Sequence, residues 1–310
     1  MKTASECKGL AQQIKQLAIE AGADLVGVAT VDRFRSPAPF SEQEVSGYLP
    51  TGYEPERLLP GARSVVVLGI GQLVGVLLSN VGDLNTTYPF GCFGYVHLNR
   101  SLNTISYRLA RWLEERSWMS VPLGQCGGAR FDYHEYSQGQ SAGPLHGIFS
   151  AKRAAVLAGM GRRARNGLVA TPRFGTRVRL GAVITTAPLD GDPLLEGTQC
   201  PPNCSICVKA CPTGAISAEG RVNHIRCYSD RGRRGTSVAQ VMHAIRKAYP
   251  IPIRDAEYLT NDREAIDGTG NRLCRAACMA FCPLGENSSP VLLRQSKKWI
   301  NSLSRIELTP

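Results

Sequence analysis

Four cysteines stand close together in the second half of this sequence. Cys200, Cys204, Cys207 and Cys211 lie within twelve positions, and the last three run C-x2-C-x3-C with Pro212 directly after them. Thiolates at this spacing can wrap one cubane iron–sulfur cluster, while the cysteine before the proline reaches toward a second cluster. The stretch therefore predicts metal ligation and electron transfer.

A second cysteine group completes the ligand set. Cys274, Cys278 and Cys282 repeat the C-x3-C-P ending, so the two groups offer seven thiolates, one fewer than two [4Fe-4S] clusters require. Cys227, in HIRCYSD between the groups, is the candidate eighth ligand. By the crossing pattern of two-cluster ferredoxins, we expect one cluster on Cys200, Cys204, Cys207 and Cys282. We expect the other on Cys211, Cys227, Cys274 and Cys278.

Structural zinc is the competing interpretation, because four thiolates also suit tetrahedral Zn²⁺. A zinc knuckle would normally pair two C-x2-C units, whereas here a proline follows both Cys211 and Cys282, which favours iron–sulfur clusters. The C-x3-C interval from Cys200 to Cys204 is longer than the usual two residues, and we expect the two prolines after Cys200 to accommodate it. The remaining cysteines are expected to be unpaired thiols: Cys7, Cys92 and Cys126.

Chain length and cysteine distribution limit the kinds of protein that this sequence can encode. A chain of 310 residues can bury a full core. Eight of its 11 cysteines crowd into 200–282, which favours metal ligation in a reducing compartment over a disulfide framework. The N-terminus has a helical period rather than an apolar signal core and lacks a twin-arginine pair, and no stretch is long and apolar enough for a membrane span. We expect a cytoplasmic protein.

The net charge of +11 admits two kinds of partner. A basic surface suits nucleic acid, but it suits an anionic cofactor and an acidic redox partner equally well. Neither basic group is interleaved with aromatic residues as a base-stacking platform would be. The basic residues gather at Arg162, Arg163, Arg165, Arg173, Arg177 and Arg179, and again at Arg226, Arg231, Arg233 and Arg234.

Apolar periodicity predicts the elements that must position these motifs. Helical spacing indicates helices at 5–22, 101–117, 149–160 (closed by Gly161) and 291–303. Continuous apolar runs indicate strands at 24–31, 64–70 and 178–186, as in a central sheet covered on both faces. The glycine-rich stretch 71–100 and the stretch 121–147 show no period, and we interpret both as functional loops. The predicted fold is an α/β domain at 1–190, a cysteine-rich domain at 191–290 and a C-terminal helix at 291–310 that packs back on it.

Segments along most of the chain resemble one superfamily, the cobalamin-dependent epoxyqueuosine reductases and reductive dehalogenases. The similar segments are EAGADLVGVA (20–29), LLPGARSVVVLG (58–69), AGMGRRARNGLVATPRFGTRVRLGAVITT (158–186), CPTGAI (211–216), IRCYS (225–229) and CPLGEN (282–287). The resemblance implies a nitroreductase-like α+β domain that binds base-off cobalamin, followed by a bacterial-ferredoxin-like domain with two [4Fe-4S] clusters. It also implies a ferredoxin or flavodoxin as the electron donor.

The resemblance carries over to individual residues unevenly. Arg165, Asn166 and Gly167 match the family's basic–Asn–Gly element, and with Pro172 and Gly175 they are the implied cobalamin contacts. The family's epoxyqueuosine reductases carry an acid in a D-T-x-P segment, and the corresponding stretch here is Ser141-Ala142-Gly143-Pro144, which lacks the aspartate.

A replacement acid must lie within hydrogen-bond reach of the reacting group, directly or through a water. Tyr133 and Tyr136 are the candidate proton donors, since a phenol acid resembles the dehalogenase pattern, and Arg165 is a candidate for steadying substrate or donor. His134, Tyr95 and His97 are further candidates by loop context.

Three functional hypotheses follow. The first is a cobalamin- and iron–sulfur-dependent reductase of a small or tRNA-linked substrate. The second is an electron-transfer or activating protein whose clusters reduce a corrinoid held by a partner protein. The third, drawn from the net charge, is epoxyqueuosine reductase proper, acting on tRNA.

Overall fold

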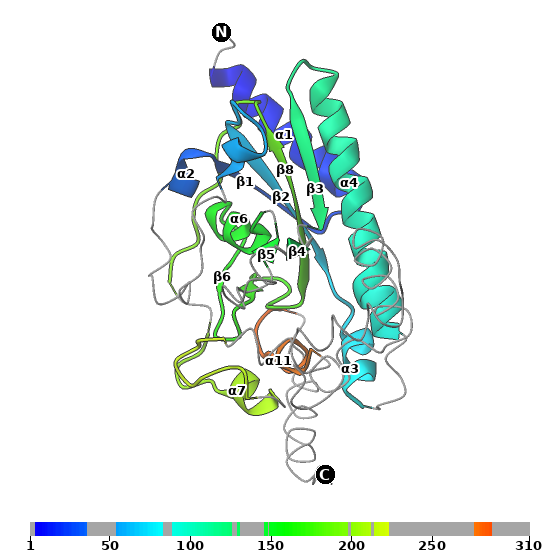
Figure 1. Cartoon of the computed structure of the whole chain (residues 1–310), viewed down its shortest axis with the longest axis vertical. Coiled ribbons are helices and arrows are strands. Elements are labelled where there is room, and N and C mark those ends of the chain that lie inside the picture. The colour runs from blue at the N-terminus through cyan, green and yellow to red at the C-terminus, as the bar shows by residue number, and fades with distance from the viewer. Residues whose placement is uncertain are drawn as a thin grey trace, which may run out of the picture.

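The fold is known from a computed structural model that describes residues 4–35, 54–82, 89–125, 129–130, 146–147, 149–197, 200–211, 214–222 and 276–286. Its centre is a four-stranded sheet (Figure 1). The strands follow the order β1 (Leu25–Thr30), β2 (Ser64–Gly71), β8 (Val178–Thr185) and β3 (Ser120–Gln125), and every neighbouring pair is antiparallel. The strands predicted at 24–31, 64–70 and 178–186 are confirmed. The mixture of helix and sheet is confirmed too, in an antiparallel arrangement.

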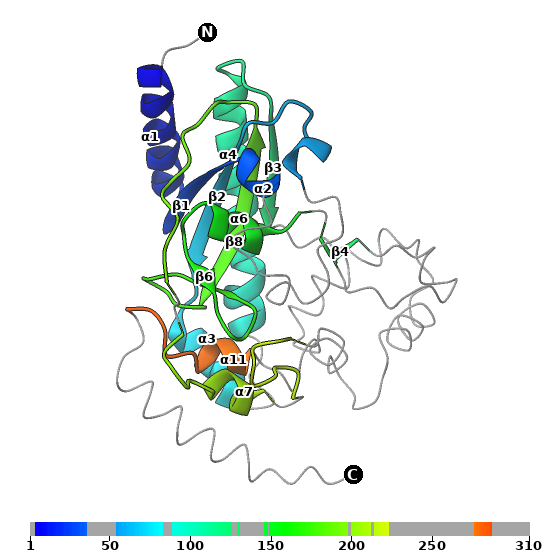
Figure 2. The same cartoon turned by 90° about the vertical axis from the view of Figure 1, so that its left-hand side faces the viewer.

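Alternation along β2 explains why both faces of the sheet are covered. Val66, Leu68 and Ile70 belong to a core shared with α1 (Ala4–Glu20) and α4 (His97–Glu114). Val65 and Val67, between them in sequence, belong to a second core with α6 (Ala151–Leu157). Successive strand residues point to opposite faces, so one apolar run supplies both cores. Figure 2 shows α6 in front of the strands and α4 behind them.

The stretch 71–100, expected to be a loop, is largely helical. It contains α3 (Val74–Gly82), a π-helix η2 (Phe90–Val96) and the first turn of α4, which begins at His97 rather than at 101. Gly94 fits inside this helical run because a Cβ there would lie 2.7 Å from Cδ2 of Phe90 and 3.2 Å from Cγ1 of Val76. The glycine is a packing contact, so interpreting the stretch as a loop was wrong.

The stretch 121–147 was also expected to be irregular, and for its first residues this was wrong. Residues 120–125 form β3, whose pairing with β8 shifts between Pro122 and Gly124. Proline is tolerated in a strand that has a neighbour on one side only, and in the described sheet β3 pairs with β8 alone. Two short strands, β4 (Ala129–Arg130) and β5 (His146–Gly147), pair with each other.

The predicted helices at 5–22 and 149–160 are confirmed, with earlier ends. The side chain of Ser150 accepts a hydrogen bond from the backbone N–H of Arg153 and caps α6. The turn after α6 uses Gly159, at φ +68°, rather than Gly161. A Cβ on Gly159 would lie 2.0 Å from the carbonyl oxygen of Pro193, so this glycine also lets the chain after β8 pass close by. The predicted C-terminal helix lies outside the described residues.

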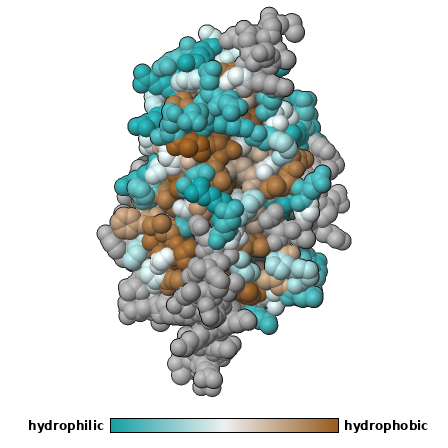
Figure 3. Space-filling view, turned by 180° about the vertical axis from the view of Figure 1, so that it is seen from behind, coloured by the Kyte–Doolittle hydropathy of each residue, from teal (hydrophilic) through white to brown (hydrophobic). Residues whose placement is uncertain are grey.

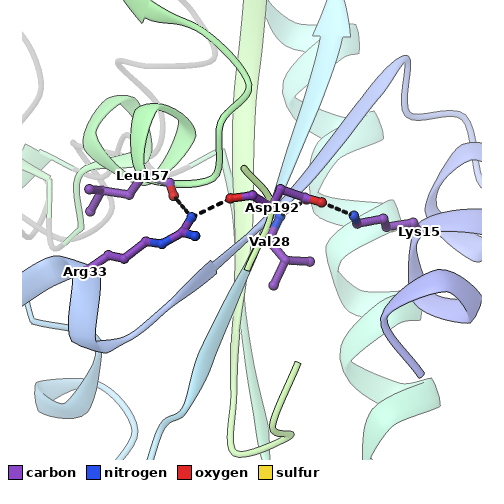
Figure 4. A network of polar contacts seen from close by, with 5 residues as sticks. All are labelled: Lys15, Val28, Arg33, Leu157 and Asp192. Carbon is purple, nitrogen blue, oxygen red and sulfur yellow. Dashed lines mark hydrogen bonds and ion pairs between the residues drawn. The ribbon is translucent and has the colours of Figure 1, made fainter. Parts of the chain in front are cut away.

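A polar network fixes the segment that leads from β8 toward the first cysteine group (Figure 4). One carboxylate oxygen of Asp192 pairs with Lys15 of α1, and the other accepts a 2.8 Å hydrogen bond from the backbone N–H of Val28 in β1. Arg33, of the short helix α2 (Asp32–Arg35), donates to the carbonyls of Leu157 and Asp192 at 2.7 Å each. Four elements, α1, β1, α2 and α6, therefore hold this connection.

Among the described residues, no helix is long and apolar enough to cross a bilayer. In the view of Figure 3, hydrophilic residues cover the N-terminal end of the molecule, and hydrophobic residues reach the surface across the middle. The remaining described elements are short: η1 (Pro55–Arg57), β6 (Arg162–Arg163), β7 (Val169–Ala170), α7 (Ile206–Ala210) and α11 (Ala277–Ala280).

Candidate metal centre

Four cysteines from two distant segments line one pocket, which we call the thiol pocket. Three come from the first cysteine group, and the fourth follows α11. The rest of the wall is the turn at 164–166, Pro201, Pro283 and Leu284. The cysteines of the thiol pocket are Cys200, Cys204, Cys207 and Cys282.

Two short helices bring these segments together beside α3 (Figures 1 and 2). Cys207 lies in α7, and Ala210 of the same helix packs into a small core with Ala277 and Ala280 of α11 and Leu77 of α3. Residues three positions apart share one face of a helix, so burying Ala210 against α11 turns Cys207 toward the same side. The small core thereby fixes where the thiol points.

Cys211 is excluded from this pocket by its backbone. It ends α7 with φ −79° and ψ 109°, an extended conformation, as expected for a residue that precedes a proline. Its sulfur accepts a 3.3 Å hydrogen bond from the backbone N–H of Ala215. Cys278, in α11, does not line the thiol pocket either. Cys211 and Cys278 belong to the second predicted ligand set, whose other members, Cys227 and Cys274, lie outside the described residues.

Burial and repulsion between neighbouring sulfurs raise the pKa of two thiols of the pocket, Cys200 and Cys207. Burial first, and then the neighbouring sulfurs of Cys282, Cys200 and Cys204, together raise the pKa of Cys207 to about 11. The pKa of Cys200 is also raised, chiefly by burial, although the backbone N–H of Arg165 donates to its sulfur at 3.4 Å and lowers it. Metal ligands must be deprotonated. A cation in the pocket would therefore replace protons and relieve the repulsion.

Four thiols are a donor set that both a cubane iron–sulfur cluster and a single Zn²⁺ can use. Within the described ranges, no three His, Cys, Asp or Glu residues are placed to share one metal ion. Four thiolates around a single Zn²⁺ at about 2.3 Å would crowd their sulfurs to within about 4 Å of one another. A cubane cluster spreads four thiolates over a wider core, and its known ligand is the Cys thiolate.

The residues 165–167, predicted to contact cobalamin, lie against the cysteine-containing segments. Asn166 is buried, and its side chain donates to the carbonyl of Cys278 at 3.1 Å and accepts from the N–H of Leu168 at 3.2 Å. The guanidinium of Arg165 donates to the carbonyl of Ala218. Gly167 has φ +74°, where a Cβ would lie 3.0 Å from Cγ2 of Val222. Their role toward cobalamin stays a prediction.

Pro172 and Gly175 belong to a turn that touches the second cysteine group. The carbonyl of Pro172 accepts a 3.2 Å hydrogen bond from the N–H of Glu286. A Cβ on Gly175 would lie 2.0 Å from the carbonyl oxygen of Leu284, and one on Gly285 would lie 2.3 Å from the nitrogen of Gly175. Two backbones therefore meet here without intervening side chains. For these two residues as well, contact with cobalamin stays a prediction.

Arg177 is a site residue that sequence reasoning placed wrongly. It was grouped with a basic face, yet it is 2% exposed and donates to the carbonyls of Cys282 and Leu284, each at 2.6 Å. Burial lowers its pKa, while the sulfur of Cys282 raises it. A signal was present in the sequence, because Arg177 directly precedes the apolar run of a central strand.

The candidate proton donors divide between described and undescribed residues. Tyr133, Tyr136 and His134 lie outside the described residues, as do Ser141 and Cys126. Tyr95 lies in η2, and the guanidinium of Arg179 stands 4.2 Å from its ring centre while donating to the amide oxygen of Asn99. His97 is exposed and packs on Phe93. Cys92 is a free, partly buried thiol in η2. The structure thus groups Tyr95, Asn99 and Arg179 at one end of β8.

Known proteins resemble this chain in sequence and in fold. No family model matches it. The epoxyqueuosine reductase of Staphylococcus aureus is 30% identical over 247 residues, which cover 72% of this chain and 57% of that protein. The chain therefore spans little more than half the length of this curated relative.

Two solved structures share the fold. A crystal structure of epoxyqueuosine reductase with an epoxyqueuosine-modified tRNA stem loop superposes with a TM-score of 0.53 at 22% identity, over 92% of this chain and 68% of the other. A catabolic reductive dehalogenase in complex with 3-bromo-4-hydroxybenzoic acid superposes with a TM-score of 0.57 at 17% identity, over 97% and 35%.

Proposed function

We propose, because the chain is similar in sequence to epoxyqueuosine reductase and in fold to that enzyme and to a reductive dehalogenase, that it belongs to their superfamily and is a cobalamin- and iron–sulfur-dependent reductase. It would use low-potential electrons from a ferredoxin or flavodoxin, with two [4Fe-4S] clusters and cobalamin as cofactors. When bound, the clusters supply one-electron carriers and cobalamin supplies a strongly reducing cobalt centre. A set of thiols kept free for metal requires a reducing compartment, so we place the protein in the cytoplasm.

One observation carries this proposal: thiols from two distant segments converge on the thiol pocket. Cys200, Cys204 and Cys207 would hold one cluster together with Cys282. The N–H of Arg165 would stabilise the thiolate of Cys200, since hydrogen bonds to the sulfurs tune such clusters. The exclusion of Cys211 and Cys278 from the pocket supports a second cluster, completed by Cys227 and Cys274.

The protein must also place substrate and deliver a proton. Tyr133 and Tyr136 remain our candidate donors, with Arg165 as a candidate steadying residue. Tyr95 joins them, because the guanidinium of Arg179, near the start of β8, packs over its ring.

Anaerobic reconstitution with iron, sulfide and cobalamin tests the proposal. We expect about eight irons per chain, as two [4Fe-4S] clusters require, and cobalamin that stays bound through gel filtration. A protein with neither iron nor corrinoid would contradict the proposal. Full iron without corrinoid would instead support the second candidate, an electron-transfer protein that activates a partner corrinoid protein.

A tRNA substrate is the third candidate, favoured by the net charge of +11 and by a similar structure that holds a tRNA stem loop. Binding to tRNA phosphates should weaken steeply with salt, because bound cations are released on association. Titrating labelled tRNA at two salt concentrations tests this candidate. Undetectable or salt-independent binding would leave a small-molecule substrate.

A further inference from the structure

Arg177 occupies an unusual electrostatic position beside the thiol pocket. It directly precedes β8 and is 2% exposed, among the largest fully buried side chains of the described residues. Its two terminal nitrogens donate to the carbonyls of Cys282 and Leu284, one on each side of Pro283. The guanidinium therefore lies against the backbone of Cys282, one of the four cysteines of the thiol pocket.

No carboxylate balances this charge in the described part of the chain. The ion pairs found there involve Lys15, Arg35 and Arg111, and none involves Arg177. Arginine stays protonated in proteins, and a buried charge without a counter-charge is costly. Two carbonyl dipoles satisfy its hydrogen bonds but leave a net positive charge. The acidic group that interacts with it is the thiol of Cys282.

A cluster in the thiol pocket would supply the missing counter-charge. Four thiolates around an iron–sulfur core carry a net negative charge, and reduction adds one more electron to it. A fixed cation beside Cys282 stabilises the reduced form more than the oxidised form. The tight contact of Gly175 with Leu284 leaves little room for the carbonyls to move away from the cation.

We propose that Arg177 is a positioning residue that holds Cys282 in the thiol pocket and whose positive charge raises the reduction potential of the cluster bound there. In the redox step the external donor loses one electron and the cluster gains it, while Arg177 keeps its proton. This inference rests on the proposed function only in requiring a cluster in the thiol pocket, and it does not require cobalamin.

An EPR-monitored redox titration of the reconstituted full chain, without corrinoid, tests the inference. The variants are Arg177→Met, which removes the charge, and Arg177→Lys, which keeps it. Arg173→Met is the matched control, because Arg173 is exposed on the same turn and its guanidinium packs on Phe174. Opposite charges at close range shift a protonation equilibrium about tenfold or more. By analogy, for Arg177→Met we expect a tenfold lower reduced-to-oxidised ratio at a fixed potential, equivalent to about 59 mV.

We expect a changed midpoint potential for only one of the two proposed clusters. Arg177→Met should lower one midpoint, while Arg177→Lys and Arg173→Met stay at the wild-type value. If Arg177→Met fails to retain iron while Arg177→Lys retains it at the wild-type potential, the charge is again the active feature. An unchanged midpoint in an iron-replete Arg177→Met protein overturns the inference. Equal shifts or equal iron loss in the Met and Lys variants also overturn it, because geometry rather than charge would then be responsible. Wild-type protein without iron would refute the proposed clusters themselves.

Discussion

Replacing Gly175 with alanine tests whether the close approach of two backbones holds the thiol pocket together. Gly175 has φ +56°, and a Cβ there would lie 2.0 Å from the carbonyl oxygen and 2.5 Å from the carbonyl carbon of Leu284. The left-handed conformation costs a non-glycine residue about 1–2 kcal/mol, and forcing atoms into a packed site costs about 1–3 kcal/mol more. Gly175→Ala should therefore lower the free energy of unfolding by about 2–5 kcal/mol.

The same substitution should also reduce metal binding, because a displaced Leu284 pulls on Cys282 two positions earlier. Gly61→Ala is the matched control: Gly61 has φ +78°, but a Cβ there would meet nothing within 4 Å. It should show the conformational cost alone and keep its iron. Chemical unfolding and iron content after anaerobic reconstitution are the two assays. Equal destabilisation of the two variants, with wild-type iron in both, would refute the reasoning.

Three further predictions concern neighbouring contacts. Asn166→Leu should lower the free energy of unfolding by about 1–3 kcal/mol, since it removes part-buried hydrogen bonds to the carbonyl of Cys278 and the N–H of Leu168, each worth about 0.5–1.5 kcal/mol; a variant as stable as wild type in chemical unfolding would contradict this. Asp192→Ala should cost more stability than Asp192→Asn, because only alanine leaves the N–H of Val28 unpaired; chemical unfolding of both variants compares them, and equal losses would argue against the network. In metal-free protein, the raised pKa of Cys207, about 11 against 9.0, means that its thiolate forms only at higher pH. Alkylation at pH 8, followed by mass spectrometry, should therefore be about a hundredfold slower than in the unfolded chain, and equal rates would contradict the burial of this thiol.

Sequence periodicity predicted the central elements because their burial is uniform. The run Val65–Leu68 in β2 is buried on both faces, so its apolar character is continuous and easy to recognise. The helices at α1 and α6 were recognised from spacing in the same way. The apolar patterns of these elements depend on local composition, which can be read directly from the sequence.

Two stretches were wrongly expected to be loops at positions where a glycine or a proline serves packing rather than chain flexibility. Gly94 leaves room for the ring of Phe90 in the same π-helix and for Val76 of α3, and Pro122 lies in a strand whose described partner is on one side only. Both residues lie in stretches that were interpreted as loops. The tertiary neighbours, Val76 of α3 for Gly94 and β8 for Pro122, distinguish the two roles.

The candidate site was predictable in its ligands but not in its surroundings. Cysteine spacing grouped Cys282 with Cys200, Cys204 and Cys207, and these four line one pocket in the structure. Their role as ligands stays a prediction. The burial of Arg177 was missed, because its charge was interpreted as part of a basic face and its place directly before an apolar strand was not used. Its position depends on a turn meeting the second cysteine group.

The most direct test of the central claim is the iron and sulfide content of Cys282→Ala after anaerobic reconstitution, with Cys92→Ala as the control. Cys92 is a free thiol in η2, outside the thiol pocket. If Cys282 completes a cluster with the first cysteine group, wild type and Cys92→Ala should hold about eight irons and Cys282→Ala about four. Wild-type iron and sulfide in Cys282→Ala, or stoichiometric zinc in place of iron in the wild type, would contradict the account.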